Sequence, residues 1–195
     1  MKKILIFCFS LFLFTETIYA TEGNGIIGGK MTGGIGNVSI YIDNQTHPYA
    51  TYYQRLIKNA VSNWDNTGYG TNDFNYVYVG SNRGSKIDIY NKYGDYFGEE
   101  KNKIYALTYF LTASETIIEK PTTTNWYSAT IELNDYKLSQ DSVSNQVATG
   151  TFAHEIGHAF GLDHRLIKKS IMAQVWLRTV QKVQKIDNDT LNNIY

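Results

Sequence analysis

Eleven residues in the second half of the chain, HEIGHAFGLDH at positions 154–164, hold three of its four histidines. Residues four apart on a helix project from one face, one turn apart, so His154 and His158 can bind one metal ion. Gly161 can adopt a left-handed conformation that ends the helix and turns the chain, which brings His164 to the same ion. Three imidazoles leave a fourth tetrahedral position open, which is the arrangement of catalytic rather than structural zinc.

Glu155 follows the first of these histidines, and its carboxylate suits the chemistry of such a site. A zinc ion held by His154, His158 and His164 lowers the pKa of a water molecule and polarises a substrate carbonyl. Glu155 then accepts the proton of that water and delivers it to the leaving amine. Copper and nickel also bind imidazoles, but HExxH is an established zinc pattern, so we expect one catalytic zinc ion. The alternative is that these histidines are polar residues of a helix surface that stand together by chance.

The rest of the chain predicts an α+β fold. Apolar residues recur at helical spacing from Tyr49 to Trp64, and His47 with Pro48 is interpreted as the start of this helix. Further helices are expected over residues 142–160 and 187–195, the last capped by Asp187. Alternating or β-branched runs predict strands over residues 38–42, 76–79, 86–90, 104–112 and 129–133.

With its flanks, the histidine motif resembles the metzincin zinc endopeptidases, whose HExxHxxGxxH pattern is followed by a methionine-containing turn. Met172 lies eight residues after His164, in the run Ser170-Ile171-Met172. So short a spacing is most similar to the matrixins, the family of the matrix metalloproteinases and their microbial relatives. The resemblance implies a twisted, mostly parallel sheet with one antiparallel edge strand, three helices and a zinc cleft. It also implies that Met172 forms a hydrophobic floor beneath the metal.

The same resemblance implies where a substrate binds. Matrixins lay an extended peptide along an edge strand by main-chain hydrogen bonds. The strand expected over residues 104–112 aligns with it, so Ala106, Leu107 and Thr108 are the expected substrate-binding residues. A plain core strand is the alternative interpretation.

Residues 1–20 are typical of a secretory signal peptide. Lys2 and Lys3 precede an apolar run that is too short to span a bilayer as a helix, and the segment ends at Ala20. The single cysteine, Cys8, lies inside this run. A cysteine that ligates zinc to keep the enzyme latent is therefore not expected in the mature chain.

Residues 21–36 separate the signal peptide from the peptidase domain expected at residues 37–195. They hold seven of the sixteen glycines and favour a flexible arm or a short pro-segment. Glu22 is the only acidic residue of this arm, and its carboxylate could ligate the zinc until the arm is removed. A disordered terminus is the alternative.

Composition limits the partners of the chain. It has 18 basic and 18 acidic residues, so it lacks the basic surplus that binding to nucleic acid requires. We expect a monomer with protein or peptide substrates and with no stable membrane anchor once the signal peptide is removed. The acidic residues Asp95, Glu99 and Glu100 are candidate calcium ligands, and a solvated loop is the alternative.

Together these features predict a secreted, extracellular zinc metalloendopeptidase that uses Glu155 as general base and acid. The alternative is a catalytically weak binding protein or toxin on the same fold, because fold alone does not guarantee activity. A metal-sequestering protein is a third class, but it would not need Glu155 beside its ligands.

Overall fold

The computed structural model describes residues 24–43 and 50–195. The expected signal peptide and Glu22 lie outside the described residues, and so do His47 and Pro48. None of the helices in the described part of the chain is long and apolar enough to cross a membrane.

A five-stranded sheet forms the base of the fold, in the order β2-β1-β3-β5-β4. Four strands run parallel, and β4 pairs antiparallel with β5 at one edge. The strands are β1 (Val38–Ile42), β2 (Tyr76–Val79), β3 (Ile87–Lys92), β4 (Ala106–Leu111) and β5 (Ser128–Asn134). This confirms the expected α+β class and the mostly parallel sheet with one antiparallel edge strand.

Four α-helices are present among the described residues, one more than expected. They are α1 (Ala50–Asp65), α2 (Asp135–Gln140), α3 (Asn145–Ala159) and α4 (Lys185–Ile194), and a 3-10 helix, η1, covers Gly98–Asn102. The single helix expected over residues 142–160 begins later, because Ser144 caps α3 by accepting a hydrogen bond from the N–H of Val147. The additional helix α2 has a cap of its own, since the Asn134 side chain accepts from the N–H of Lys137.

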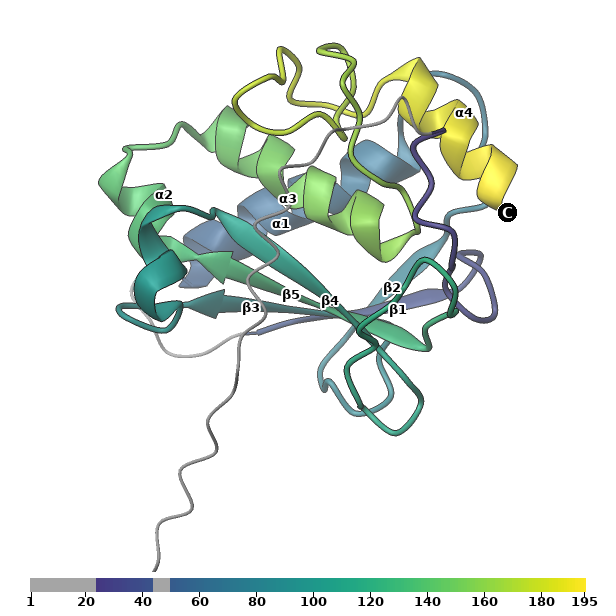
Figure 1. Ribbon diagram of the computed structural model, residues 1–195, viewed down its shortest axis with the longest axis horizontal. Coiled ribbons are helices and arrows are strands. Elements are labelled where there is room, and N and C mark those ends of the chain that lie inside the picture. The colour runs from purple at the N-terminus through teal and green to yellow at the C-terminus, as the bar shows by residue number, and fades with distance from the viewer. Residues whose placement is uncertain (1–23, 44–49) are drawn as a thin grey trace, which may run out of the picture.

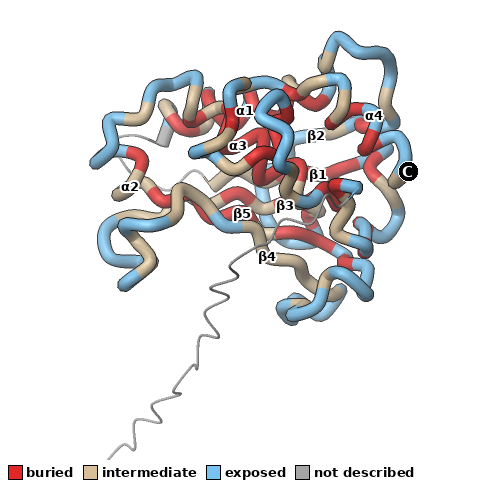
Figure 2. Tube along the Cα trace, turned by 45° about the horizontal axis from the view of Figure 1, so that its top comes forward, coloured by how far each residue is buried: buried red, intermediate tan, exposed pale blue. Residues whose placement is uncertain are grey.

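The core lies between the sheet and the helices α1 and α3, which cover one face of the sheet (Figure 1). Alternate residues of β1 and β3 point into this layer, as their burial patterns show. Buried residues gather there, between the two layers (Figure 2). The largest fully buried side chains include Ile40, Ile57, Trp64, Ile87, Ile89, Ile131, Phe152 and Phe160.

Two buried tryptophans fix the position of α3. The indole N–H of Trp64 on α1 donates to the carbonyl oxygen of Ala153 at 2.8 Å. The indole N–H of Trp126, just before β5, donates to the carbonyl oxygen of Ala159 at 3.0 Å. Since both indole donors are satisfied, these large side chains can be buried without loss of a hydrogen bond. The helix that carries the histidine motif is thereby attached to α1 and to the start of β5.

The described part of the glycine-rich segment, residues 24–36, packs against the body of the protein. Met31 and Ile35 are buried in the core. The N–H of Ile27 donates to the carbonyl oxygen of Gly161 at 2.9 Å. In the structure these residues are held by core contacts of their few apolar side chains, which the glycine content alone did not indicate.

Candidate active site

The helix α3 places His154 and His158 one turn apart, as the motif predicts. The helix ends at Ala159, and Gly161 follows with φ of +101°. In this conformation the N–H of Gly161 donates to the carbonyl oxygen of His158 at 2.8 Å, and the chain turns back. The left-handed conformation expected of Gly161 is thus confirmed.

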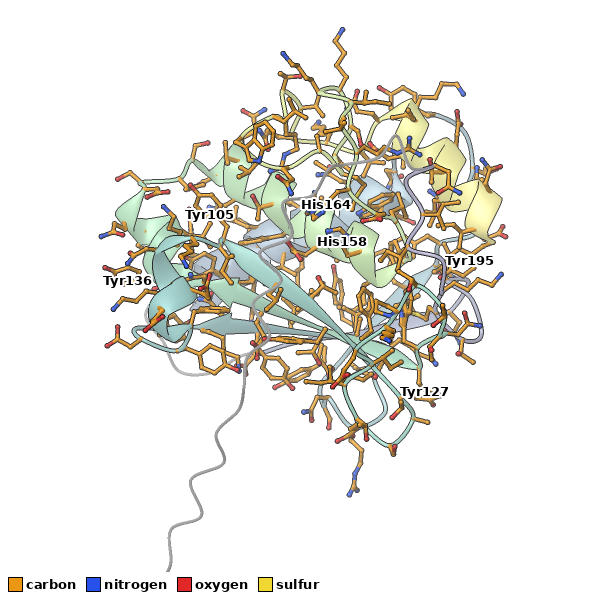
Figure 3. All side chains as sticks on the ribbon, in the orientation of Figure 1. Tyr105, Tyr127, Tyr136, His158, His164 and Tyr195 are labelled. Atoms are coloured by element: carbon orange, nitrogen blue, oxygen red, sulfur yellow. The ribbon has the colours of Figure 1, made fainter. Side chains whose placement is uncertain are left out.

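The three predicted ligands come together. The ligand nitrogens of His154, His158 and His164 all lie within 4.8 Å of one another, and no other group of potential ligands of this kind occurs in the described ranges. The Nε2 atoms of His154 and His158 are 3.1 Å apart. Figure 3 shows His164 beside His158, where the chain returns after α3.

The backbone fixes which nitrogen of each α3 histidine can bind a metal. Nδ1 of His154 lies 2.8 Å from the carbonyl oxygen of Ile171, and Nδ1 of His158 lies 2.8 Å from that of Leu162. A carbonyl oxygen only accepts, so we infer that each Nδ1 carries the proton and each Nε2 has a free lone pair. Metal-binding histidines are commonly oriented in this way. The donor set therefore fits a zinc ion.

The electrostatics of the cluster also favour metal binding. Burial lowers the pKa of His154 and His158 below the ordinary value, and the neighbouring imidazoles lower that of His154 further. Burial and His158 lower the pKa of His164 to about 4. All three rings are therefore neutral near pH 7, which is the form that donates to a metal.

Glu155 is buried between α3 and the edge strand β4. The hydroxyl of Thr108 donates to Oε2 of Glu155 at 2.7 Å. Burial raises the pKa of Glu155, and the hydrogen bond from Thr108 opposes this rise. The carboxylate is therefore held by the sheet and has one oxygen, Oε1, that Thr108 does not occupy.

The residues expected to bind substrate lie on β4, at the edge of the sheet. The Leu107 side chain is exposed, and Ala106 is partly buried. The side chain of Thr108 turns inward to Glu155, a contact that the sequence did not predict. β4 has only one strand neighbour, β5, in the described sheet.

Met172 is fully buried next to α3. A Cβ atom at Gly157 would lie 2.4 Å from the sulfur of Met172 and 2.9 Å from a ring carbon of Trp64. The glycine inside the HExxH motif therefore allows both side chains to approach the helix closely. A glycine in the middle of a predicted helix was the sequence signal for this approach.

The turn that contains Met172 is tied to α4 by a buried carboxylate. Asp187 accepts hydrogen bonds from the Ser170 hydroxyl and from the N–H groups of Ile171 and Gln184, the last two at 2.9 Å. It lies in the third position of α4, which begins at Lys185, and closes a capping box with Gln184. The predicted capping role holds, although the helix begins two residues earlier than expected.

Arg178 is a residue of this region that sequence reasoning missed. Its side chain is buried, and its guanidinium donates to Thr151 Oγ1 on α3 at 3.1 Å. Burial lowers its pKa to about 10, and the charge of Glu155 opposes this shift. None of the ion pairs found among the described residues includes it. A single cation in a loop gives no sequence pattern that would have identified it.

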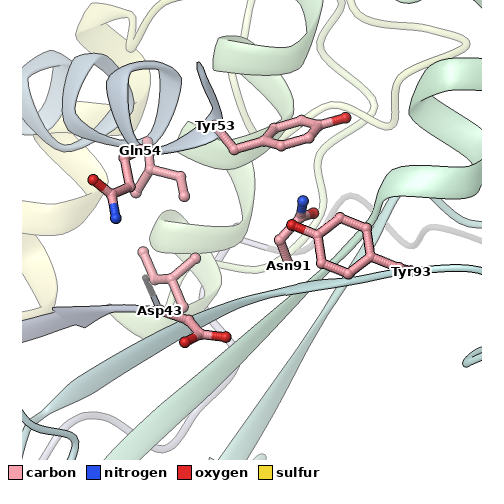
Figure 4. A pocket seen from close by; sticks show the side chains of 7 residues that line it. Asp43, Tyr53, Gln54, Asn91 and Tyr93 are labelled. Carbon is pink, nitrogen blue, oxygen red and sulfur yellow. The ribbon is translucent and has the colours of Figure 1, made fainter. Parts of the chain in front are cut away.

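Two other places in the structure are weaker candidates for a binding site. The acidic residues proposed for calcium do not form a ligand group in the described ranges. Instead, Asp95 pairs with Lys101 and Glu100 with Lys103. A cavity of about 10 Å³ lies between α1 and the ends of β1 and β3, and its lining includes Asp43, Tyr53, Gln54, Asn91 and Tyr93 (Figure 4). It has room for one water molecule at most, which excludes a substrate.

The comparison with known families agrees with this geometry. The matrixin profile, of peptidase family M10, matches residues 36–195, which is most of the chain. A comparison with curated proteins gave no match. The match contains the three histidines, Glu155 and Met172. The chain therefore belongs to the matrixin family of zinc metalloendopeptidases.

Proposed function

We propose that this protein is a secreted zinc-dependent endopeptidase that hydrolyses peptide bonds in extracellular proteins or peptides. One observation carries the proposal: three neutral imidazoles converge on one point beside a buried carboxylate. The pattern of residues 1–20 supports secretion.

His154, His158 and His164 would hold the zinc ion through their ligand nitrogens. When bound there, zinc supplies a Lewis acid for the substrate carbonyl and makes a water molecule more acidic. Glu155 accepts the proton of that water at Oε1, because Thr108 holds Oε2. The same atom then delivers the proton to the nitrogen of the leaving amine. Burial supports this second step, since it raises the pKa of Glu155 and so makes the protonated form easier to reach.

The substrate would bind as an added strand along β4. This edge strand has only β5 beside it in the described sheet, and Thr108 links it directly to Glu155. Main-chain hydrogen bonds to residues 106–108 would hold an extended peptide in register, while its side chains alternate between the two faces. The scissile bond would thereby be placed next to the metal ligands.

The test is cleavage of a proteome-derived peptide library by the zinc-loaded mature protein, with sequencing of the new ends. We expect new peptide ends that disappear when a zinc chelator is added and that form at least about 100-fold more slowly with the Glu155→Gln variant. A fully zinc-loaded, folded protein that produces no new ends would contradict the proposal. That result would favour the alternative, a binding protein or toxin on the same fold.

A further inference from the structure

The chain between α3 and α4 forms two loops that protrude at the top of the view in Figure 1. They cover residues 165–170 and 173–179. The N–H and hydroxyl of Thr179 both donate to the carbonyl oxygen of Lys168, at 2.9 and 3.0 Å. Because of these bonds the two loops form one surface next to the metal centre, which we call the double loop.

The double loop exposes large apolar side chains. Trp176 is 74 % exposed, and both Leu166 and Ile167 on the neighbouring loop are exposed by more than 40 %, at 51 % and 44 %. The other two tryptophans, Trp64 and Trp126, are fully buried. Apolar side chains that gather on adjacent loop tips are typical of a surface that binds something.

The charge around these side chains has one sign. Residues 164–186 contain six lysines and arginines, of which Arg178 is buried, and no acidic residue, whereas the whole chain has 18 of each sign. Lys168, Lys169 and Lys182 are exposed, and no ion pair found in the described part of the chain includes them. A partner of this surface must therefore be anionic as well as able to accept apolar groups.

We propose that the double loop docks the protein reversibly on an anionic phospholipid bilayer. Trp176, Leu166 and Ile167 would enter the boundary between headgroups and acyl chains, where an indole finds both apolar and polar surroundings. Lys168 and Lys169 would contact the lipid phosphates. The surface needs no spanning helix and does not depend on peptidase activity.

A second copy of the chain fits this surface less well than a bilayer. Two double loops placed face to face would bring their cations together with no acidic residue of residues 164–186 between them, and like charges oppose such an interface. An acidic protein could satisfy the lysines. The protruding apolar tips match a fluid bilayer, however, because it can close around them without a preformed pocket.

Trp176 supplies its own probe, because it is the only exposed tryptophan of the three. The mature protein is titrated with vesicles of phosphatidylcholine and phosphatidylglycerol, and with vesicles of phosphatidylcholine alone. We expect a blue shift of tryptophan emission with the anionic vesicles and quenching by brominated acyl chains. Cosedimentation gives the bound fraction independently of fluorescence.

Substitutions separate the contribution of the lysine charges from that of the apolar side chains. Neutralising both lysines, Lys168→Gln with Lys169→Gln, should weaken vesicle binding about 25-fold, since each lysine near an anionic surface contributes about fivefold. Trp176→Ala should weaken it on the order of tenfold, measured by cosedimentation. The matched controls are Ile117→Ala, which is 52 % exposed on the loop between β4 and β5, and the exposed Lys120→Gln. Both controls should bind as the parent does.

Two results of the vesicle experiments would overturn the proposal. The first is no binding to anionic vesicles by a folded protein, and the second is equal binding by the double-loop variants and the controls. If the double loop promotes cleavage of an acidic protein and does not bind lipid, it is a protein-binding surface. If the protein sediments as a dimer, the surface serves self-association. Each of these outcomes contradicts lipid docking. The Glu155→Gln variant should bind vesicles normally, so a failure of the proposed peptidase activity is distinguishable from a failure here.

Discussion

The metal-binding stretch, residues 154–164, and the N-terminal segment, residues 24–36, meet at the same loop. Only the metal-binding stretch has a sequence pattern that predicts its role in the structure. Residues 154–164 carry a spacing that predicts shared ligands, while residues 24–36 show only glycine and a few apolar residues. Yet the carbonyl oxygen of Gly25 accepts a hydrogen bond from Asp163, the residue before His164, at 2.8 Å. Local spacing thus predicts which side chains can share an ion, whereas the support of the loop that carries one of them comes from a distant segment.

If this division is correct, changes in the metal-binding stretch remove metal or chemistry, and changes in the N-terminal segment remove stability. The largest effect is expected for His158→Ala, which deletes one of the three ligands. Bound zinc should fall below one equivalent by metal analysis, and peptidase activity should fall to background. The matched control is His47→Ala, because His47 is the fourth histidine of the chain and is not a predicted ligand. Full zinc occupancy in His158→Ala would remove His158 from the ligand set.

Glu155→Gln tests the proton transfer and leaves the metal ligands unchanged. The amide keeps the size of the side chain and can still pair with Thr108, but it cannot accept the proton of water. Turnover should fall on the order of 10² to 10⁴, with one equivalent of zinc retained. The exposed Glu119→Gln serves as the matched control. Near-normal hydrolysis by Glu155→Gln would exclude it as the proton acceptor.

Met31→Ala tests whether the N-terminal segment contributes to stability. Met31 is buried in the core, so truncation should lower the free energy of unfolding by about 2 to 5 kcal/mol. Zinc content of the folded protein should stay at one equivalent, because no ligand is changed. Denaturant unfolding measures the first quantity and metal analysis the second, with the exposed Thr32→Ala as control. An unchanged unfolding midpoint would mean that the N-terminal segment is not part of the stable fold.

The same comparison changes the expectation for latency. If Glu22 ligates the zinc until the arm is removed, a protein that begins near Gly36 should be more active than one that begins at Thr21. Removal of the segment would also delete Met31 and Ile35 from the core, so we now expect a less stable protein with lower activity. Glu22→Ala in the longer protein tests latency without this loss, since a rise in its activity would identify Glu22 as an inhibitory ligand.

Much of the fold was predictable because its signals are local. The first helix and all five strands follow from apolar periodicity, which reports one face of one element at a time. The helix α2 was missed, since six residues are too few to show a helical period. Arg178 was missed because its place beside α3 depends on how a loop packs. The predicted ligands were found together because a helix and one glycine turn fix their geometry within eleven residues.

The smallest effect is expected at Thr108, where the structure adds a side-chain contact that the sequence did not predict. The resemblance implies that the main chain of Thr108 binds substrate, and in the structure its hydroxyl also donates to the Glu155 carboxylate. Thr108→Val removes the hydroxyl and keeps the shape of the side chain. Loss of one hydrogen bond to a charged group should lower kcat about tenfold. KM should change little, because main-chain contacts to a substrate do not involve the hydroxyl.

The conservative variant Thr108→Ser should restore kcat, because it returns the donor. Thr130→Val is the matched control, since Thr130 lies on the neighbouring strand β5, where it pairs with Tyr109 of β4. A purely structural role for Thr108 would lower the unfolding midpoint and would not produce a kcat effect that serine rescues. A rise in KM with unchanged kcat would contradict the role of Thr108 in holding Glu155, because it would mean that the Thr108 side chain acts on substrate binding and not through Glu155.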